Sequence, residues 1–80
     1  MHTLCTATVS SLTYAIKGQK LLAKEGIESR LVKPNAKKAR RGCAFGIEFP
    51  CQELRHARSI LTAAHLPVND YFNGGGGELL

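Results

Sequence analysis

Two amphipathic stretches, each flanked by short strand-like segments, constrain most strongly what this chain can fold into. The first is expected to be a helix over residues 12–25, because apolar side chains recur there at helical spacing and Gly26 follows as a terminator. The second is expected to be a helix that begins at the turn containing Pro50 and ends before Pro67. Strands are expected over residues 3–9, 27–33, 43–49 and 68–72.

The resulting order, strand-helix-strand-strand-helix-strand, is typical of the ferredoxin-like arrangement within the α+β class. Right-handed crossovers then give an antiparallel sheet of strand order 4-1-3-2, with both helices on one face. We expect a single domain over residues 1–72, followed by a glycine-rich disordered tail over residues 73–80. Gly18 lies inside the first helix, where a close approach to the sheet would offset its poor helix propensity.

Cys43 lies between a basic segment and an apolar strand pattern. Residues 30–41 include six basic residues and no acidic one. Cys43 is expected to begin the third strand, which starts at the sheet end where the first strand stops and the first helix begins. Basic side chains and a helix N-terminus both favour a thiolate or another anion. The candidate anion-binding residues are Ser10, Ser11, Lys37, Lys38, Arg40 and Arg41.

The basic segment admits several interpretations. It can be a solvated loop, an anion site or a nucleic-acid contact, and Cys43 can be a reactive thiol or a small buried hydrophobic residue. Nucleic acid is not favoured, because the aromatic residues lack the pattern of a sheet that stacks RNA bases. The alternative function is a non-catalytic binding module whose residues 30–41 hold nucleic acid or an acidic protein partner.

Four segments carry a family resemblance that extends over residues 6–71. They are Ala15-Ile16-Lys17-Gly18-Gln19-Lys20-Leu21-Leu22, Gly26-Ile27, Pro34 and Cys43-Ala44-Phe45-Gly46-Ile47. In this order they resemble the small selenium/sulfur carrier-like domains, a family of unknown function. The resemblance implies that Cys43 holds sulfur or selenium as a persulfide or selenosulfide, and that donor and acceptor proteins are its partners. The chain departs from the family pattern at Ala44, where glycine is usual, and at Arg40 and Arg41, where serines are common.

The other two cysteines are expected at the sheet end opposite Cys43. Cys5 is expected in the core, and Cys51 is expected as a partly buried residue in the first turn of the second helix. Three cysteines without a framework spacing predict free thiols and a reducing, cytoplasmic setting. A resolving partnership with Cys43 is not expected, because the third strand alone spans about 20 Å at roughly 3.3 Å per residue.

Other functional classes lack their motifs in this chain. Cys51 and His56 are out of phase on a helix, and no C-x-x-C or H-x-x-x-H pair occurs, so no metal and no cofactor are expected. The glycines at 74–77 lack the strand and helix context of a phosphate-binding loop. Without a catalytic Ser/His/Asp arrangement the chain is not expected to be a conventional hydrolase, and whether it is an enzyme of another kind is left open, with a non-enzyme favoured. Neither a membrane span nor a signal peptide is expected.

Overall fold

The computed structural model describes residues 3–34, 45–73 and 78–79. Its elements in chain order are β1 (Leu4–Val9), α1 (Leu12–Lys24), β2 (Arg30–Lys33), β3 (Phe45–Pro50), the 3-10 turn η1 (Cys51–Glu53), α2 (Leu54–Ala63), β4 (Asp70–Asn73) and β5 (Glu78–Leu79). The strands form one sheet in the order β4-β1-β3-β2-β5, and every pair of neighbours is antiparallel.

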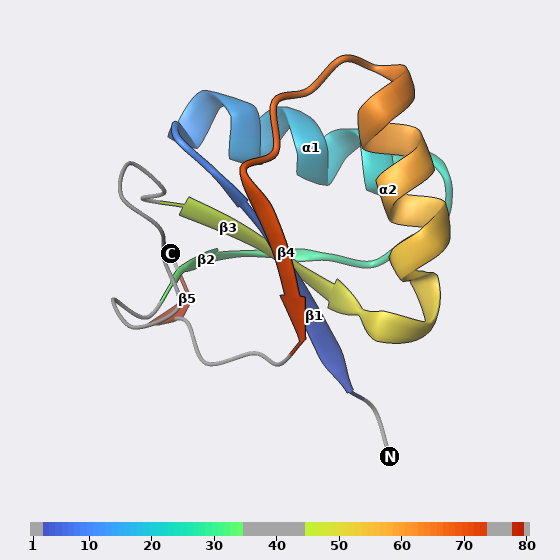
Figure 1. The fold of residues 1–80 in the computed structure, drawn as a ribbon, viewed down its shortest axis with the longest axis horizontal. Coiled ribbons are helices and arrows are strands. Elements are labelled where there is room, and N and C mark those ends of the chain that lie inside the picture. Colours follow the sequence, from blue (N-terminus) through green and yellow to red (C-terminus); the bar gives the residue numbers. More distant parts are fainter. Residues whose placement is uncertain (1–2, 35–44, 74–77, 80) are drawn as a thin grey trace.

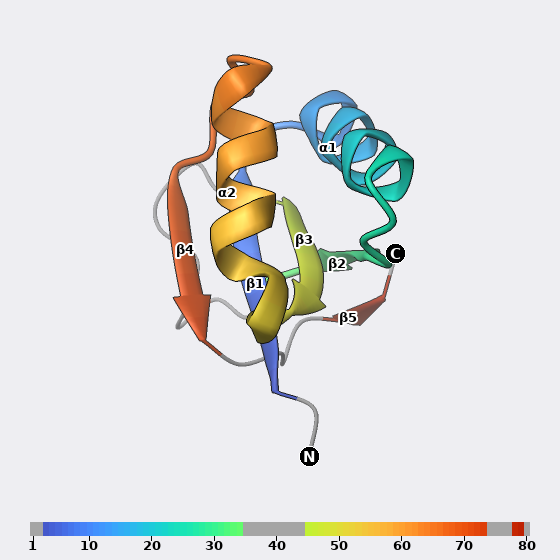
Figure 2. The same ribbon diagram turned by 90° about the vertical axis from the view of Figure 1, so that its right-hand side faces the viewer.

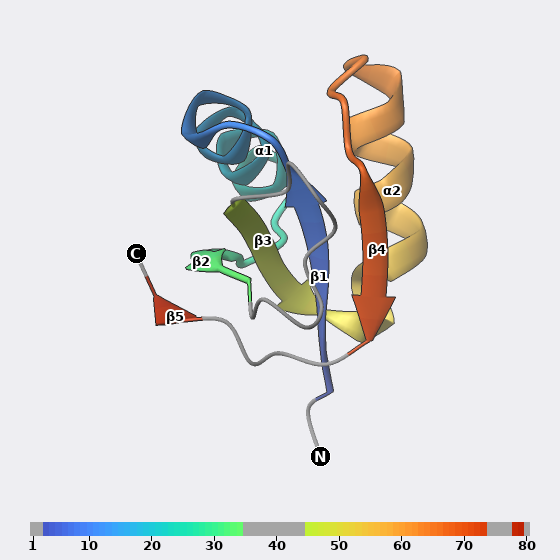
Figure 3. The same ribbon diagram turned by 60° about the vertical axis from the view of Figure 1, so that its left-hand side comes forward.

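The predicted ferredoxin-like arrangement is confirmed. The expected order 4-1-3-2 is the observed order of the first four strands, and both helices lie on the same face of the sheet (Figures 1 and 3). In the register of β1 and β3, Val9 lies opposite Phe45 and Cys5 lies opposite Phe49. The end of β1 and the start of β3 therefore meet at one end of the sheet, as the topology required.

The hydrophobic core lies between the sheet and the two helices (Figure 2). Alternate residues of β1 and β3 supply the sheet side, because successive side chains of a strand point to opposite faces. The fully enclosed side chains include Val9, Ile47 and Phe49 from the strands, and Leu22 and Leu61 from the helices. Burial of such side chains stabilises a domain by roughly 1.5–3 kcal/mol each, so this layer holds both helices on the sheet.

Local signals set both ends of α1, and its end before Gly26 was predicted. Ser11 is the N-cap, with extended backbone angles and a side-chain Oγ that accepts a hydrogen bond from the Tyr14 N–H at 3.2 Å. At the other end the Gly26 N–H donates to the Ala23 carbonyl at 3.0 Å, and Gly26 has a φ of 80°. Only glycine adopts this left-handed conformation without steric cost, which explains why the helix ends at this residue.

Gly18 allows α1 to approach the sheet closely, as expected. A methyl group in place of its hydrogen would overlap Ile47 Cδ1 and lie 3.1 Å from Leu66 Cδ2. Gly18→Ala is therefore expected to lower the free energy of unfolding by about 1 kcal/mol, because overpacking outweighs the gain in helix propensity. Urea unfolding measures the change, and the exposed Lys20→Ala serves as a control within about 0.5 kcal/mol of the wild type. A stabilised Gly18→Ala protein would contradict this packing.

Several observed boundaries differ from the predicted ones. β2 begins at Arg30 rather than at residue 27, and β4 begins at Asp70 rather than at residue 68. The disordered tail predicted for residues 73–80 is wrong at Asn73, which ends β4, and at Glu78–Leu79, which form β5. β5 pairs with β2, whose outer edge would otherwise present unpaired backbone groups. The division into one domain over residues 1–72 stays a prediction.

The sheet face opposite the helices carries buried polar residues. Glu48 is 5% exposed and forms an ion pair with the Arg30 guanidinium, while Thr8 Oγ1 donates to the Asp70 carbonyl at 3.3 Å. The apolar pattern expected for the third strand does not indicate this second buried face. A buried carboxylate persists when a guanidinium compensates its charge, and Arg30 supplies that charge.

Tyr71 on β4 contacts α2 through a cation–π interaction with Arg58, whose guanidinium carbon lies 5.5 Å from the ring centroid. Burial raises the pKa of the Tyr71 phenol, and the positive charge of Arg58 lowers it in part.

In the part of the chain that the structure describes, no helix is long and apolar enough to cross a membrane.

Candidate functional site

The predicted site is only partly within the described residues. Ser10 and Ser11 are described, and they join the end of β1 to the start of α1. Ser10 is exposed, and Ser11 is half-buried because its side chain caps the helix. The other predicted site residues, Lys37, Lys38, Arg40, Arg41 and Cys43, lie outside the described residues. Their assignment to an anion site therefore stays a prediction.

The described border of this site is the start of α1. Val9 is fully buried and pairs with Phe45, the first residue of β3. The first turn of α1, which is described throughout, contains no acidic side chain. The positive partial charge of the helix N-terminus is therefore not offset by a carboxylate of its own first turn. This arrangement favours an anion near Ser10 and Ser11 over a cation.

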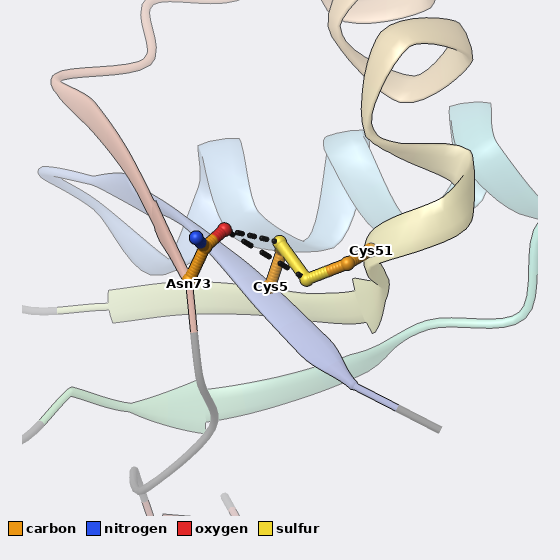
Figure 4. The surroundings of a disulfide bond; sticks show 3 residues. All are labelled: Cys5, Cys51 and Asn73. Atoms are coloured by element: carbon orange, nitrogen blue, oxygen red, sulfur yellow. Dashed lines mark hydrogen bonds between the residues drawn. A yellow bond between two sulfur atoms is a disulfide. The ribbon is translucent and has the colours of Figure 1, made fainter. Parts of the chain in front are cut away.

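Cys5 and Cys51 form a disulfide at the opposite end of the sheet (Figure 4). Their Cα atoms are 4.9 Å apart, although 46 positions separate them in the sequence. β1 and β3 bring them together, since Leu4 pairs with Pro50 and the Cys51 N–H donates to the Thr3 carbonyl at 2.8 Å. The prediction that both cysteines lie at one end of the sheet is confirmed, and the prediction that they are free thiols is wrong.

The two sulfur atoms of the disulfide have different surroundings. Cys5 is 1% exposed and belongs to the core, whereas Cys51 is partly exposed at the start of η1. The side chain of Asn73, which pairs with Cys5 across β1 and β4, points at both sulfurs (Figure 4). Its Oδ1 lies 3.2 Å from Cys5 Sγ and 4.0 Å from Cys51 Sγ. Neither sulfur carries a proton in the disulfide, so Oδ1 can accept a hydrogen bond from a thiol only after reduction.

A groove lies between the two helices and is lined in part by titratable side chains. Its volume is about 480 Å³, and Leu21 and Ile60 line it together with Glu25 and His56. His56 Nε2 lies 3.8 Å from Glu25 Oε1, and His56 Nδ1 lies 3.6 Å from Glu53 Oε2. Among the residues that the structure describes, no group of three or more His, Cys, Asp or Glu side chains is arranged to hold a metal ion.

Fold and cysteines together define a small α+β domain of ferredoxin-like topology with one disulfide between β1 and η1. The family model described as "Putative Se/S carrier protein-like" matches residues 4–73, so the chain belongs to this family. The resemblance seen in the sequence is confirmed. No curated protein and no solved structure matches the chain.

Proposed function

We propose that this protein is a thiol-based sulfur or selenium carrier in which Cys43 holds a persulfide or selenosulfide. The observation that carries the proposal is the Cys5–Cys51 disulfide, which engages two of the three cysteines of the chain. Cys43 then has no second cysteine of its own chain available. A carrier benefits from this, because a neighbouring thiolate would attack a persulfide and discharge it as a disulfide. Membership of the family supports the same chemistry.

Two features support an anionic form of Cys43. Phe45 follows Cys43 by two residues and pairs with Val9, after which α1 begins. Two residues of chain reach at most about 7 Å, so Cys43 can lie near the end of β1, where the N-terminus of α1 would favour a thiolate or a persulfide anion. The proposed anion-binding residues are Ser10, Ser11, Lys37, Lys38, Arg40 and Arg41. The partial charge of the helix and the charges of the basic segment act in the same direction.

Both steps of the proposed cycle are thiol exchanges. In loading, the Cys43 thiolate attacks the terminal sulfur of a donor persulfide, and the donor leaves as a thiolate. In delivery, a thiolate of the acceptor protein attacks the terminal sulfur on Cys43 and releases the Cys43 thiolate. Selenium follows the same route when it occupies the terminal position. Neither step consumes an external oxidant or reductant, so donor and acceptor proteins are the only partners that the cycle requires.

The proposal predicts that Cys43 is a reactive thiolate near neutral pH. Replacing Arg40 and Arg41 by Gln is expected to slow its alkylation by iodoacetamide about two- to fivefold at low salt. The reason is that an exposed charge several ångströms from a thiolate stabilises it by about 0.5 kcal/mol. The difference is expected to shrink at high salt, where exposed charges are screened. Mass spectrometry of Cys43 at several pH values measures the rates. The matched control is Lys17→Gln with Lys20→Gln, which removes two charges from the exposed surface of α1.

A slower alkylation of Cys43 than of a cysteine in a short peptide, at every pH tested, would contradict the proposal. The basic segment would then be better explained as a binding surface for a polyanion. Such binding weakens steeply with rising salt, whereas transfer of sulfur to Cys43 requires no polyanion. A salt titration with a nucleic acid therefore separates the two functions.

A further inference from the structure

The two cysteines of the Cys5–Cys51 disulfide differ in burial, since Cys5 is enclosed in the core and Cys51 is only partly buried against it. Cys5 is 1% exposed within the core cluster, and Cys51 is partly exposed at the first position of η1. Thiol–disulfide exchange depends on which sulfur a nucleophile can reach. A nucleophile from solvent is therefore expected to attack Cys51 in preference to Cys5, so that Cys5 becomes the leaving group.

Backbone pairing holds both cysteines in place without the disulfide. β1 pairs with β3 through six residue pairs, from Leu4 opposite Pro50 to Val9 opposite Phe45. In addition, the Cys51 N–H donates to the Thr3 carbonyl at 2.8 Å. Cleavage of the sulfur–sulfur bond therefore leaves both sulfurs near their original positions, and the bond can form again.

Asn73 can accept a hydrogen bond from the Cys5 thiol that this cleavage produces. Its Oδ1 lies 3.2 Å from Cys5 Sγ, within the distance at which a thiol donates a hydrogen bond to an amide oxygen (Figure 4). Burying a thiol without a hydrogen-bond acceptor costs free energy because the thiol loses its hydration. Asn73 Oδ1 offsets this cost for Cys5 by accepting the hydrogen bond. The site is thus built to hold Cys5 as a thiol as well as in the disulfide.

We propose that this disulfide is a second chalcogen-loading site, at which hydrosulfide or hydroselenide attacks Cys51 Sγ. The new bond joins the incoming sulfur or selenium to Cys51, and the bond between Cys51 and Cys5 breaks. Cys5 leaves with the electron pair and takes the proton of the incoming anion, so that its thiol donates to Asn73 Oδ1. The products are a Cys51 persulfide or selenosulfide anion and a Cys5 thiol. The disulfide supplies the oxidising equivalents, so no other oxidant is needed.

The reverse reaction releases the chalcogen. The Cys5 thiolate attacks Cys51 Sγ, restores the disulfide and expels hydrosulfide or hydroselenide. The loaded anion lies at the N-terminus of the helical segment formed by η1 and α2, where backbone dipoles favour negative charge. Glu53 is an acidic side chain of this same turn, and its charge opposes this effect; its Oε2 lies 3.6 Å from His56 Nδ1. This inference rests on the family's chalcogen chemistry but not on Cys43, from which it is chemically independent.

The test uses oxidised Cys43→Ala protein, which retains only the disulfide pair. Under anaerobic, native conditions it is incubated with sulfide, with selenide or with glutathione, and then trapped with iodoacetamide. Mass spectrometry is expected to find one added sulfur or selenium atom on Cys51 and a directly alkylated Cys5. Sulfide and selenide are expected to react more than about tenfold faster than glutathione, because the small anions reach a partly buried sulfur more easily. If Cys51 gains no sulfur or selenium while Cys43 of the wild type still does, the second loading site is excluded and the proposed function of Cys43 is unaffected.

Three results would overturn the inference. They are addition to Cys5 in place of Cys51, addition only after the protein is unfolded, and glutathione reacting as fast as sulfide. Asn73→Ala tests the acceptor, and it is expected to shift the equilibrium about fivefold towards the disulfide, the effect of one hydrogen bond. Gln52→Ala, which removes an exposed amide side chain next to Cys51, is the matched control. An unchanged equilibrium in Asn73→Ala, with the fold intact by circular dichroism, would remove Asn73 from the site.

Discussion

Reduction of the Cys5–Cys51 disulfide is expected to lower the free energy of unfolding by about 4 kcal/mol. The bond joins residues that are 46 positions apart, so it closes more than half of the chain into a loop. Closing a loop of this length restricts the unfolded chain, and reduction restores its conformational freedom. Urea unfolding of the oxidised and the reduced protein measures the difference directly, because it changes no residue.

The reduced protein is nevertheless expected to stay folded. The six residue pairs between β1 and β3 and the core beneath them remain after reduction. The control is a Cys5→Ala and Cys51→Ala protein, in which reductant is expected to change nothing. A loss below about 1 kcal/mol would contradict the stabilising role of the bond. Complete unfolding on reduction would instead exclude the loading reaction proposed for Cys51, which requires a folded reduced state.

The sequence predicted the order of the elements because their signals are local. The terminator at Gly26 and the helical stripes each depend on a few neighbouring residues. The strand order followed from that order and from the handedness of crossovers. These rules also placed Cys5 and Cys51 at the same end of the sheet, which the disulfide confirms.

The bond itself could not be predicted by the same reasoning. An odd number of cysteines without a framework spacing argued for free thiols, but it is equally compatible with one pair and one single cysteine. The topological proximity of Cys5 and Cys51 was the signal that could have identified the pair. Proximity at a sheet end becomes a bond only when the two Cα atoms are close enough, here 4.9 Å apart, and sequence patterns do not give such distances.

β5 and the buried Glu48 depend on long-range partners. Glu78 and Leu79 have no strand pattern of their own, and they are a strand because the edge of β2 is there to pair with them. Glu48 reads from its sequence position as a solvent-facing residue of an alternating strand. Its burial follows from the charge of Arg30, which lies opposite it on β2. Neither the pairing of β5 with β2 nor that of Glu48 with Arg30 can be recognised from the local sequence.

Cys43→Ala is expected to abolish transfer of sulfur to the segment that precedes β3. In the wild type the Cys43 thiolate attacks the terminal sulfur of a polysulfide, gains one sulfur atom and releases a polysulfide shorter by one sulfur. The variant lacks this nucleophile but keeps the Cys5–Cys51 pair, so any sulfur that it takes up belongs to that pair. The comparison of the two proteins therefore assigns the loaded sulfur to one site or the other.

The most direct measurement is the mass of the peptide that contains Cys43 after exposure of the oxidised protein to polysulfide and trapping with iodoacetamide. Trypsin leaves Cys43 and Cys51 together in residues 42–55, so a second cleavage with a glutamate-specific protease at Glu48 separates them. The carrier function predicts one added sulfur atom on the Cys43 peptide of the wild type. A Cys43 that is alkylated directly, without added sulfur at any polysulfide concentration, would contradict it.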